Sequence, residues 1–160
     1  MRPAAGRPRP PGAPGGGAAG SPWTPAVIRR QVVLEELAPL PDGRAAVVVR
    51  RSAAALGYRS HLWRVPVGAG RARALTAGPV RDRAPRVSPD GRRVAFLRSW
   101  PGEPARPPAV LILELAGGEP WVVVAPPHGV REVVWAPDGR RLALAAGADP
   151  PRFLVGPTAP

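Results

Sequence analysis

The apolar residues occur in short runs between turn residues and do not follow helical spacing. Val94–Leu97 and Val110–Leu113 are continuous apolar runs with Pro, Gly or Asp nearby on both sides. Such runs are typical of strands that are covered on both faces, because a half-exposed strand alternates apolar and polar residues. The chain is therefore expected to be all-β. In its best-preserved stretch the pattern predicts four short strands, at 85–88, 92–98, 109–115 and 120–124.

The same pattern repeats with a constant period, which changes the fold that it predicts. A Pro-Asp-Gly tripeptide occurs three times at a spacing of 48 residues. A second element keeps this spacing, because residues 61–70 and 109–118 carry apolar residues at corresponding places. Two elements in one register make coincidence a poor explanation. The tripeptides are Pro41, Asp42 and Gly43, then Pro89, Asp90 and Gly91, then Pro137, Asp138 and Gly139.

The Pro-Asp-Gly tripeptides are interpreted as structural turns. Proline presets φ for a turn, aspartate accepts a bond from a backbone N–H further on, and glycine adopts the left-handed conformation. Gly117 and Gly118 are expected to form the turn of another hairpin. The residue before the tripeptide varies, because Leu40 and Ala136 stand where the middle copy has Ser88.

A repeated unit of four short strands predicts a partial β-propeller, with about two and a half four-stranded blades. A β-helical solenoid is the competing fold, but its coils are shorter and are not joined by hairpin turns. Residues 23–160 are assigned to the incomplete propeller. Residues 24–38 are expected to begin as a short helix, with Thr24 as its cap and Pro25 at its first position. The blades are placed at about 30–80, 81–129 and 130–160, the last being partial.

Residues 1–22 consist almost entirely of Pro, Gly, Ala and Arg and offer no large apolar side chain for a core. They are predicted to be a disordered tail. They lack the apolar core of a signal peptide, and no later stretch approaches the roughly 20 apolar residues of a membrane helix. A cytoplasmic location without membrane contact is expected.

Composition removes several classes of site. The chain has no cysteine, which excludes disulfides, thiolate metal sites and a cysteine nucleophile. The net charge of +12 rests on 23 arginines without lysine, and it attracts polyanions without specificity. Nucleic acid is not expected as a specific partner, because the charge is spread along the chain. Trp63 and Trp135 fall in predicted strands that also contain valine, which indicates burial between blades more than base stacking.

No residues form a recognisable catalytic, cofactor-binding or metal-binding group. A hydrolase serine lies in Gly-x-Ser-x-Gly at a strand-to-helix turn, and no serine of this chain has that context. His61 and His128 are interpreted as surface or packing residues. Glu35 and Glu36 are adjacent and point to opposite faces of a strand, so one is expected to be solvated and the other locally paired. The serines are Ser21, Ser52, Ser60, Ser88 and Ser99.

The stretch LTAGPVRDRAPRVSPDGRRVAFL at 75–97 resembles the repeat in the amino-terminal propeller of the prolyl oligopeptidase family of serine peptidases. Its acylaminoacyl-peptidase and dipeptidyl-peptidase-like members are the most similar. Residues 58–67 and 130–156 resemble neighbouring parts of that domain. The Pro-Asp-Gly repeat is also similar to that of TolB-like proteins.

The resemblance implies a non-catalytic role in proteolysis. In the family the propeller caps the active site of a hydrolase domain that follows it and admits only short peptides, and that domain is expected to be absent from this chain. The chain would then be a fragment or the product of a truncated gene, and inactive by itself. The alternative is a TolB-like module that binds a protein partner.

Overall fold

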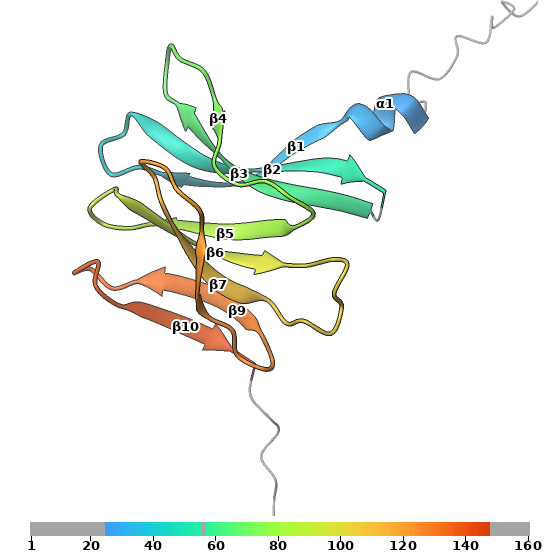
Figure 1. The fold of residues 1–160 in the computed structure, drawn as a ribbon. Helices are drawn as coiled ribbons and strands as arrows, with labels where there is room; N and C mark the ends of the chain where they lie inside the picture. Colours follow the sequence, from blue (N-terminus) through green and yellow to red (C-terminus); the bar gives the residue numbers. More distant parts are fainter. Residues whose placement is uncertain (1–24, 56, 148–160) are drawn as a thin grey trace, which may run out of the picture.

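The computed structural model describes residues 25–55 and 57–147, and the predicted tail at 1–22 lies outside them. These residues form one short helix and ten strands (Figure 1). The helix begins at Pro25 as expected, whereas Thr24 is not described. The elements are α1 (Pro25–Arg30), β1 (Val32–Pro39), β2 (Ala45–Ala54), β3 (Gly57–Pro66), β4 (Arg73–Ala74), β5 (Arg81–Val87), β6 (Arg93–Ser99), β7 (Ala109–Glu114), β8 (Trp121–Val124), β9 (Val130–Trp135) and β10 (Leu142–Ala146).

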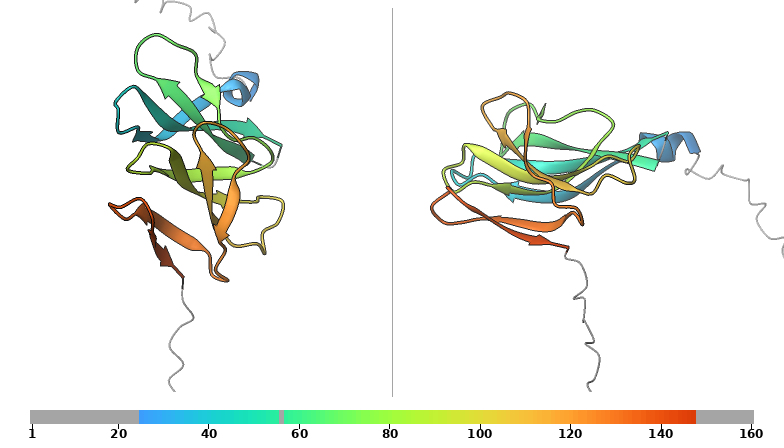
Figure 2. Two further views of the ribbon diagram at one scale, coloured as in Figure 1. Left: turned by 60° about the vertical axis from the view of Figure 1, so that its left-hand side comes forward. Right: turned by 60° about the horizontal axis from the view of Figure 1, so that its bottom comes forward.

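The strands group into three successive units. Unit 1 is β1 to β4, unit 2 is β5 to β8, and unit 3 is β9 with β10; within each unit the strand pairs are antiparallel. Units 1 and 2 are joined by a single parallel pair, Ser60 with Arg81. Unit 3 forms a separate two-stranded sheet, visible as its own layer in Figure 2. The four predicted strands of the middle stretch correspond to β5, β6, β7 and β8.

Unit 2 lies between its neighbours, and its alternating side chains fill both interfaces. Val94 and Phe96 of β6 belong to a core that includes Val47, Val49 and Leu62 of unit 1. The intervening residues of β6 face the other way, into a second core with the third unit; they are Ala95 and Leu97, packed with Val130 and Val133. All four β6 residues are completely buried. This double burial explains why all four of these consecutive positions are apolar, as the sequence indicated.

The three Pro-Asp-Gly segments form one turn geometry, at the same end of their hairpins (Figure 1). Each glycine has φ between 65° and 71° and donates its N–H to the carbonyl of the residue before the proline. Each aspartate Oδ1 accepts the N–H of the arginine two residues later, at 2.9 to 3.0 Å. The turn therefore closes by local bonds alone. Those arginines are Arg44, Arg92 and Arg140.

The first strand of every unit carries a β-bulge, which the sequence did not indicate. Register shifts lie between Leu34 and Leu37 in β1, between Arg83 and Arg86 in β5, and at the Ala145 to Ala146 step opposite β9. At the second bulge Ala84 has φ of 51°, a left-handed conformation that is uncommon without glycine. A bulge bends its strand and increases its twist. These three strands contact one another in the order β1, β5, β9.

Candidate functional site at the interface of units 1 and 2

The hydroxyls of the two buried serines form hydrogen bonds with backbone groups. Ser60 is buried, and its hydroxyl donates to the carbonyl of Asp82 at 2.8 Å. Ser88 is buried in the middle turn, 2.6 Å from Asp90 Oδ1, and its Oγ accepts the Arg93 N–H at 2.9 Å. These bonds account for both hydroxyls without a catalytic partner. Ser52 and Ser99 are half-buried strand residues, and Ser21 lies outside the described residues.

The Ser88 hydroxyl also affects the pKa of the Asp90 carboxyl in the same turn. The Ser88 hydroxyl, followed by the Arg92 backbone N–H, lowers the pKa of Asp90 below its ordinary value of 3.8. Hydrogen bonds to a carboxylate favour its charged form, which is the physical cause of this direction. The first and third turns lack this hydroxyl, because Leu40 and Ala136 take the place of Ser88.

The imidazoles are placed in surface structure. Nε2 of His61 lies 2.9 Å from the Gly78 carbonyl, and His128 is exposed in the loop between β8 and β9. In the part of the chain that the structure describes, no three His, Cys, Asp or Glu residues come together in a way that could hold a metal ion.

Glu35 is exposed, as expected for one of the two residues, whereas Glu36 has a partner 48 residues away and not the local one that was expected. Glu35 forms an ion pair with Arg51 of the adjacent strand at 2.7 Å. Glu36 reaches into unit 2, where both its carboxylate oxygens accept the Ala84 N–H at 3.0 and 3.1 Å. The left-handed bulge turns that N–H out of the β5–β6 ladder, and the neighbouring unit supplies its acceptor. Glu36 and Ala84 are 48 residues apart, at the same position of the repeat.

A buried ion pair stands next to this contact. Asp82 is completely buried and accepts two bonds from Arg98, at 2.7 and 2.9 Å. The two residues are directly opposite each other on β5 and β6. With the Ser60 bond to the Asp82 carbonyl, the pair links β3 of unit 1 to two strands of unit 2. Sequence reasoning missed it, since nothing in the pattern marks Asp82 as buried.

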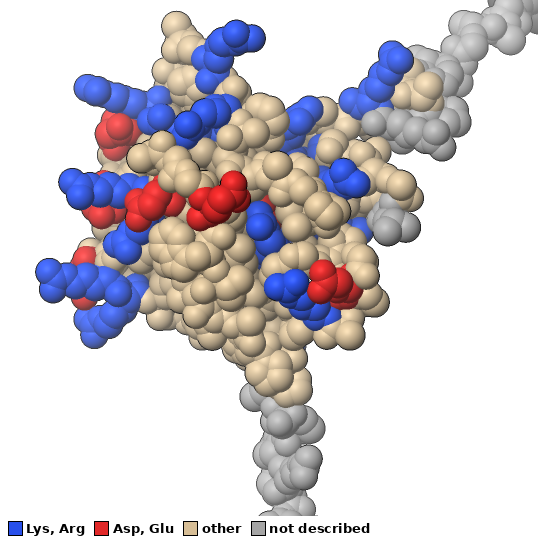
Figure 3. Space-filling model, viewed as in Figure 1, with Lys and Arg blue, Asp and Glu red and all other residues tan. Residues whose placement is uncertain are grey.

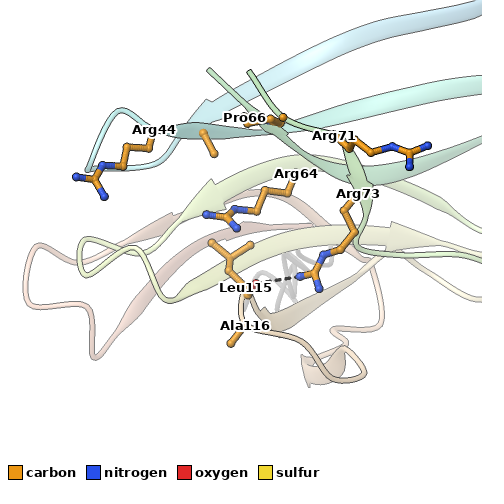
Figure 4. Close-up of a pocket in the computed structure, with 9 residues that line it drawn as sticks. Arg44, Arg64, Pro66, Arg71, Arg73, Leu115 and Ala116 are labelled. Atoms are coloured by element: carbon orange, nitrogen blue, oxygen red, sulfur yellow. Dashed lines mark hydrogen bonds between the residues drawn. The ribbon is translucent and has the colours of Figure 1, made fainter. Parts of the chain in front are cut away.

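Cavities open at both ends of this interface. One, of about 380 Å³, is lined by both acidic and basic residues, including Glu35, Tyr58 and Arg81. Another, of about 490 Å³, lies at the end that carries the Pro-Asp-Gly turns. We call it the arginine groove, because its charged lining consists of Arg44, Arg64, Arg71 and Arg73. Figure 4 shows Arg64 and Arg73 directed over Leu115, with Arg44 and Arg71 at the two ends. Figure 3 shows arginines together with acidic residues along the left edge of the molecule.

The tryptophans follow the burial prediction only in part. Trp135 packs between units 2 and 3, where its Nε1 donates to the Arg86 carbonyl at 2.8 Å. Trp63 is half-buried, with the Arg50 guanidinium 4.9 Å from its ring centre. Stacked arginines of this kind satisfy the aromatic faces within the chain.

Comparison with known proteins supports the architecture. No family model matches the chain. It is 33% identical over 106 residues to the uncharacterized peptidase YuxL of Bacillus subtilis, an alignment that covers 65% of this chain and 16% of that protein. It therefore spans about a sixth of the relative's length.

Solved structures show the same fold. An acylaminoacyl peptidase superposes with a TM-score of 0.64 and 17% identity, over 84% of this chain and 21% of that one. The β-propeller domain of the trilobed protease of Pyrococcus furiosus superposes with a TM-score of 0.56 and 19% identity, over 72% of this chain and 34% of that one. The chain is a partial β-propeller. TolB of Acinetobacter baumannii superposes with a TM-score of 0.50 and 14% identity, over 68% of this chain and 25% of that one.

In this propeller units 1 and 2 are four-stranded blades and unit 3 is part of a third, as the repeat predicted. Its propeller resembles those of prolyl oligopeptidase-like peptidases, the resemblance that the sequence suggested. Among the described residues, no helix is long and apolar enough to cross a membrane.

Proposed function

We infer that the chain is a non-catalytic propeller portion of a serine peptidase of the prolyl oligopeptidase type, which limits the access of peptides to a hydrolase domain. The observation that carries this is the match to YuxL together with the superposition on an acylaminoacyl peptidase. The hydrogen-bonded serines fit the same role, because an activated nucleophile needs a base within hydrogen-bond reach. The cytoplasm is the proposed location.

The interface of units 1 and 2 supplies the rigidity that a gate requires. The Glu36 contact joins β1 to β5, and the Asp82–Arg98 pair joins β5 to β6. The bond from the Ser60 hydroxyl to the Asp82 carbonyl adds β3. In a low-dielectric interior such bonds hold a defined geometry. Blades held in this way form a fixed wall beside an active site and exclude large substrates by size.

The first experiment tests whether the chain itself is catalytic. Purified chain is incubated with a serine-reactive fluorophosphonate probe and with acylated amino-acid substrates, and neither labelling nor turnover is expected. Labelling that disappears in Ser60→Ala or Ser88→Ala would contradict the non-catalytic role.

The second experiment reads the genomic frame around the coding sequence and separates the two functions. A Gly-x-Ser-x-Gly motif downstream in the same frame supports the peptidase. An upstream secretion signal without that motif favours a TolB-like module that binds a protein partner, which the superposition on TolB keeps as the second candidate. If a hydrolase domain is encoded, Glu36→Ala in the full polypeptide should raise kcat/KM for long peptides more than for short ones.

A further inference from the structure

We propose that the arginine groove binds a ligand that carries a diphosphate group. The groove is about 490 Å³, within the range of roughly 300–1,000 Å³ that is usual for small-molecule sites. The residues that line it include four arginines and no carboxylate, and an adjoining cavity that shares Arg64 with it is lined by Glu114. It lies between the β3–β4 hairpin of unit 1 and the end of β7 in unit 2, so packing of the two blades creates it (Figure 4).

The first argument is a like-charge pair built into the sheet. Arg64 of β3 and Arg73 of β4 are directly opposite each other in a ladder of only two residue pairs. Like charges at opposite positions on neighbouring strands destabilise their pairing. An anion bound between the two guanidinium groups converts this repulsion into attraction. Bound ligand is therefore expected to stabilise β4.

The second argument is the arrangement of hydrogen-bond donors. Arg73 uses one nitrogen to donate to the Leu115 carbonyl at 3.2 Å, which fixes its guanidinium over the groove. A guanidinium has five N–H donors in a planar fork, so further donors remain for a ligand. That fork matches the oxygens of a phosphate in a bidentate manner.

The third argument concerns ligand size and charge. A carboxylate offsets one of the four positive charges, whereas a diphosphate brings at least two negative charges and several acceptor oxygens. The guanidinium groups of Arg44 and Arg71 point outward at the two ends in Figure 4. Both side chains are exposed, and exposed side chains change rotamer within nanoseconds, so they are able to close on a ligand. No aromatic residue lines the groove to stack a nucleic-acid base.

The experiment measures binding of inorganic pyrophosphate to the full chain by equilibrium dialysis at physiological salt. We expect saturable binding with one site per chain. Arg64→Gln with Arg73→Gln should weaken it by about tenfold or more, because two bidentate contacts are lost. The control, Arg59→Gln with Arg140→Gln, removes the same charge from exposed positions outside the groove and should change binding by less than about twofold. Equal loss in both pairs, or binding without saturation, would overturn the proposal.

A second variant covers the case in which the first pair fails to fold. Arg44→Gln with Arg71→Gln leaves the Arg73–Leu115 bond in place and should weaken pyrophosphate binding several-fold with an unchanged circular dichroism spectrum. Binding that is unaffected in this variant, when the first pair is unfolded, would overturn the proposal.

Two further ligands identify the source of the diphosphate. ADP that binds as tightly as pyrophosphate supports recognition of the diphosphate alone, and tighter binding of ADP supports a nucleotide ligand. Single-stranded DNA that binds more tightly than both, and equally to the groove and control variants, would overturn the proposal in favour of general polyanion attraction. None of these outcomes depends on the peptidase role.

Discussion

Ser88 distinguishes the middle turn from the other two copies. Its buried hydroxyl accepts the Arg93 N–H and contacts Asp90, whereas Leu40 and Ala136 provide no such group. Ser88→Ala should therefore speed amide exchange at Arg93 by roughly fivefold, which corresponds to about 1 kcal/mol for a lost buried hydrogen bond. Ser52→Ala serves as the control and should leave this rate unchanged. Equal rates at Arg93 in both variants would show that the hydroxyl contributes nothing to the turn.

The same turn has a pH dependence with a defined direction. The pKa of Asp90 is lowered from 3.8, chiefly by the Ser88 hydroxyl. In the pH range of this titration the folded chain therefore binds fewer protons than the unfolded chain. The carboxylate stabilises the turn above the unfolded pKa, and this stability is lost as pH falls through the folded pKa below 3.8. A carboxyl-carbon NMR titration should find the Asp90 midpoint below 3.8. In Ser88→Ala the midpoint should rise, and an unchanged midpoint would contradict the assigned cause.

At the scale of elements, the Asp82–Arg98 pair joins β5 to β6 in a setting where Asp82 is completely buried. Arg98→Met leaves that carboxylate without its charged partner and should lower the free energy of unfolding by about 3–5 kcal/mol. The double variant Asp82→Val with Arg98→Met removes both charges and should be markedly more stable than Arg98→Met. Urea titrations followed by tryptophan fluorescence at matched protein concentration compare the two. A double variant less stable than the single one would contradict the assignment of the loss to an unpaired buried carboxylate.

At the scale of the whole molecule, no blade formed by the described residues packs against the outer face of unit 3. Val134 and its cross-strand partner Ala143 are exposed on this face, Val134 by 47%, whereas Val133 on the opposite face is completely buried. Open apolar faces and strand edges promote association, so the isolated chain should be oligomeric or poorly soluble despite its charge of +12. Light scattering after size-exclusion chromatography checks this. A monomer that unfolds in one cooperative transition would contradict it.

Two pairs of substitutions test whether the outer face of unit 3 causes this association. Val134→Lys with Ala143→Lys, two residues directly opposite each other on β9 and β10, places charges on its open face and should increase the monomer fraction severalfold. Val67→Lys with Ala72→Lys adds the same charge in the exposed loop between β3 and β4 and should have little effect. If both pairs increase the monomer fraction equally, net charge and not the open face controls association.

The sequence by itself determined the repeat, the strands and the turns, because each depends on a few neighbouring residues. Gly43, Gly91 and Gly139 adopt a left-handed conformation that is most accessible to glycine, and the aspartate beside each bonds only two residues away. The apolar runs of β6 and β7 likewise indicated burial on both faces. A constant period of 48 residues was sufficient to count the blades.

Only the tertiary structure decided which distant residues meet. The Glu36 bond to Ala84 depends on a bulge and on the packing of two blades, and the arginine groove combines side chains from residue 44 to residue 116. From the sequence, Glu36 was expected to have at most a local partner. Its actual partner is the backbone N–H of Ala84, which in a regular strand would bond within the sheet and would not be available. Such contacts depend on blade packing, whose geometry is set by many residues at once and leaves no short pattern in the sequence.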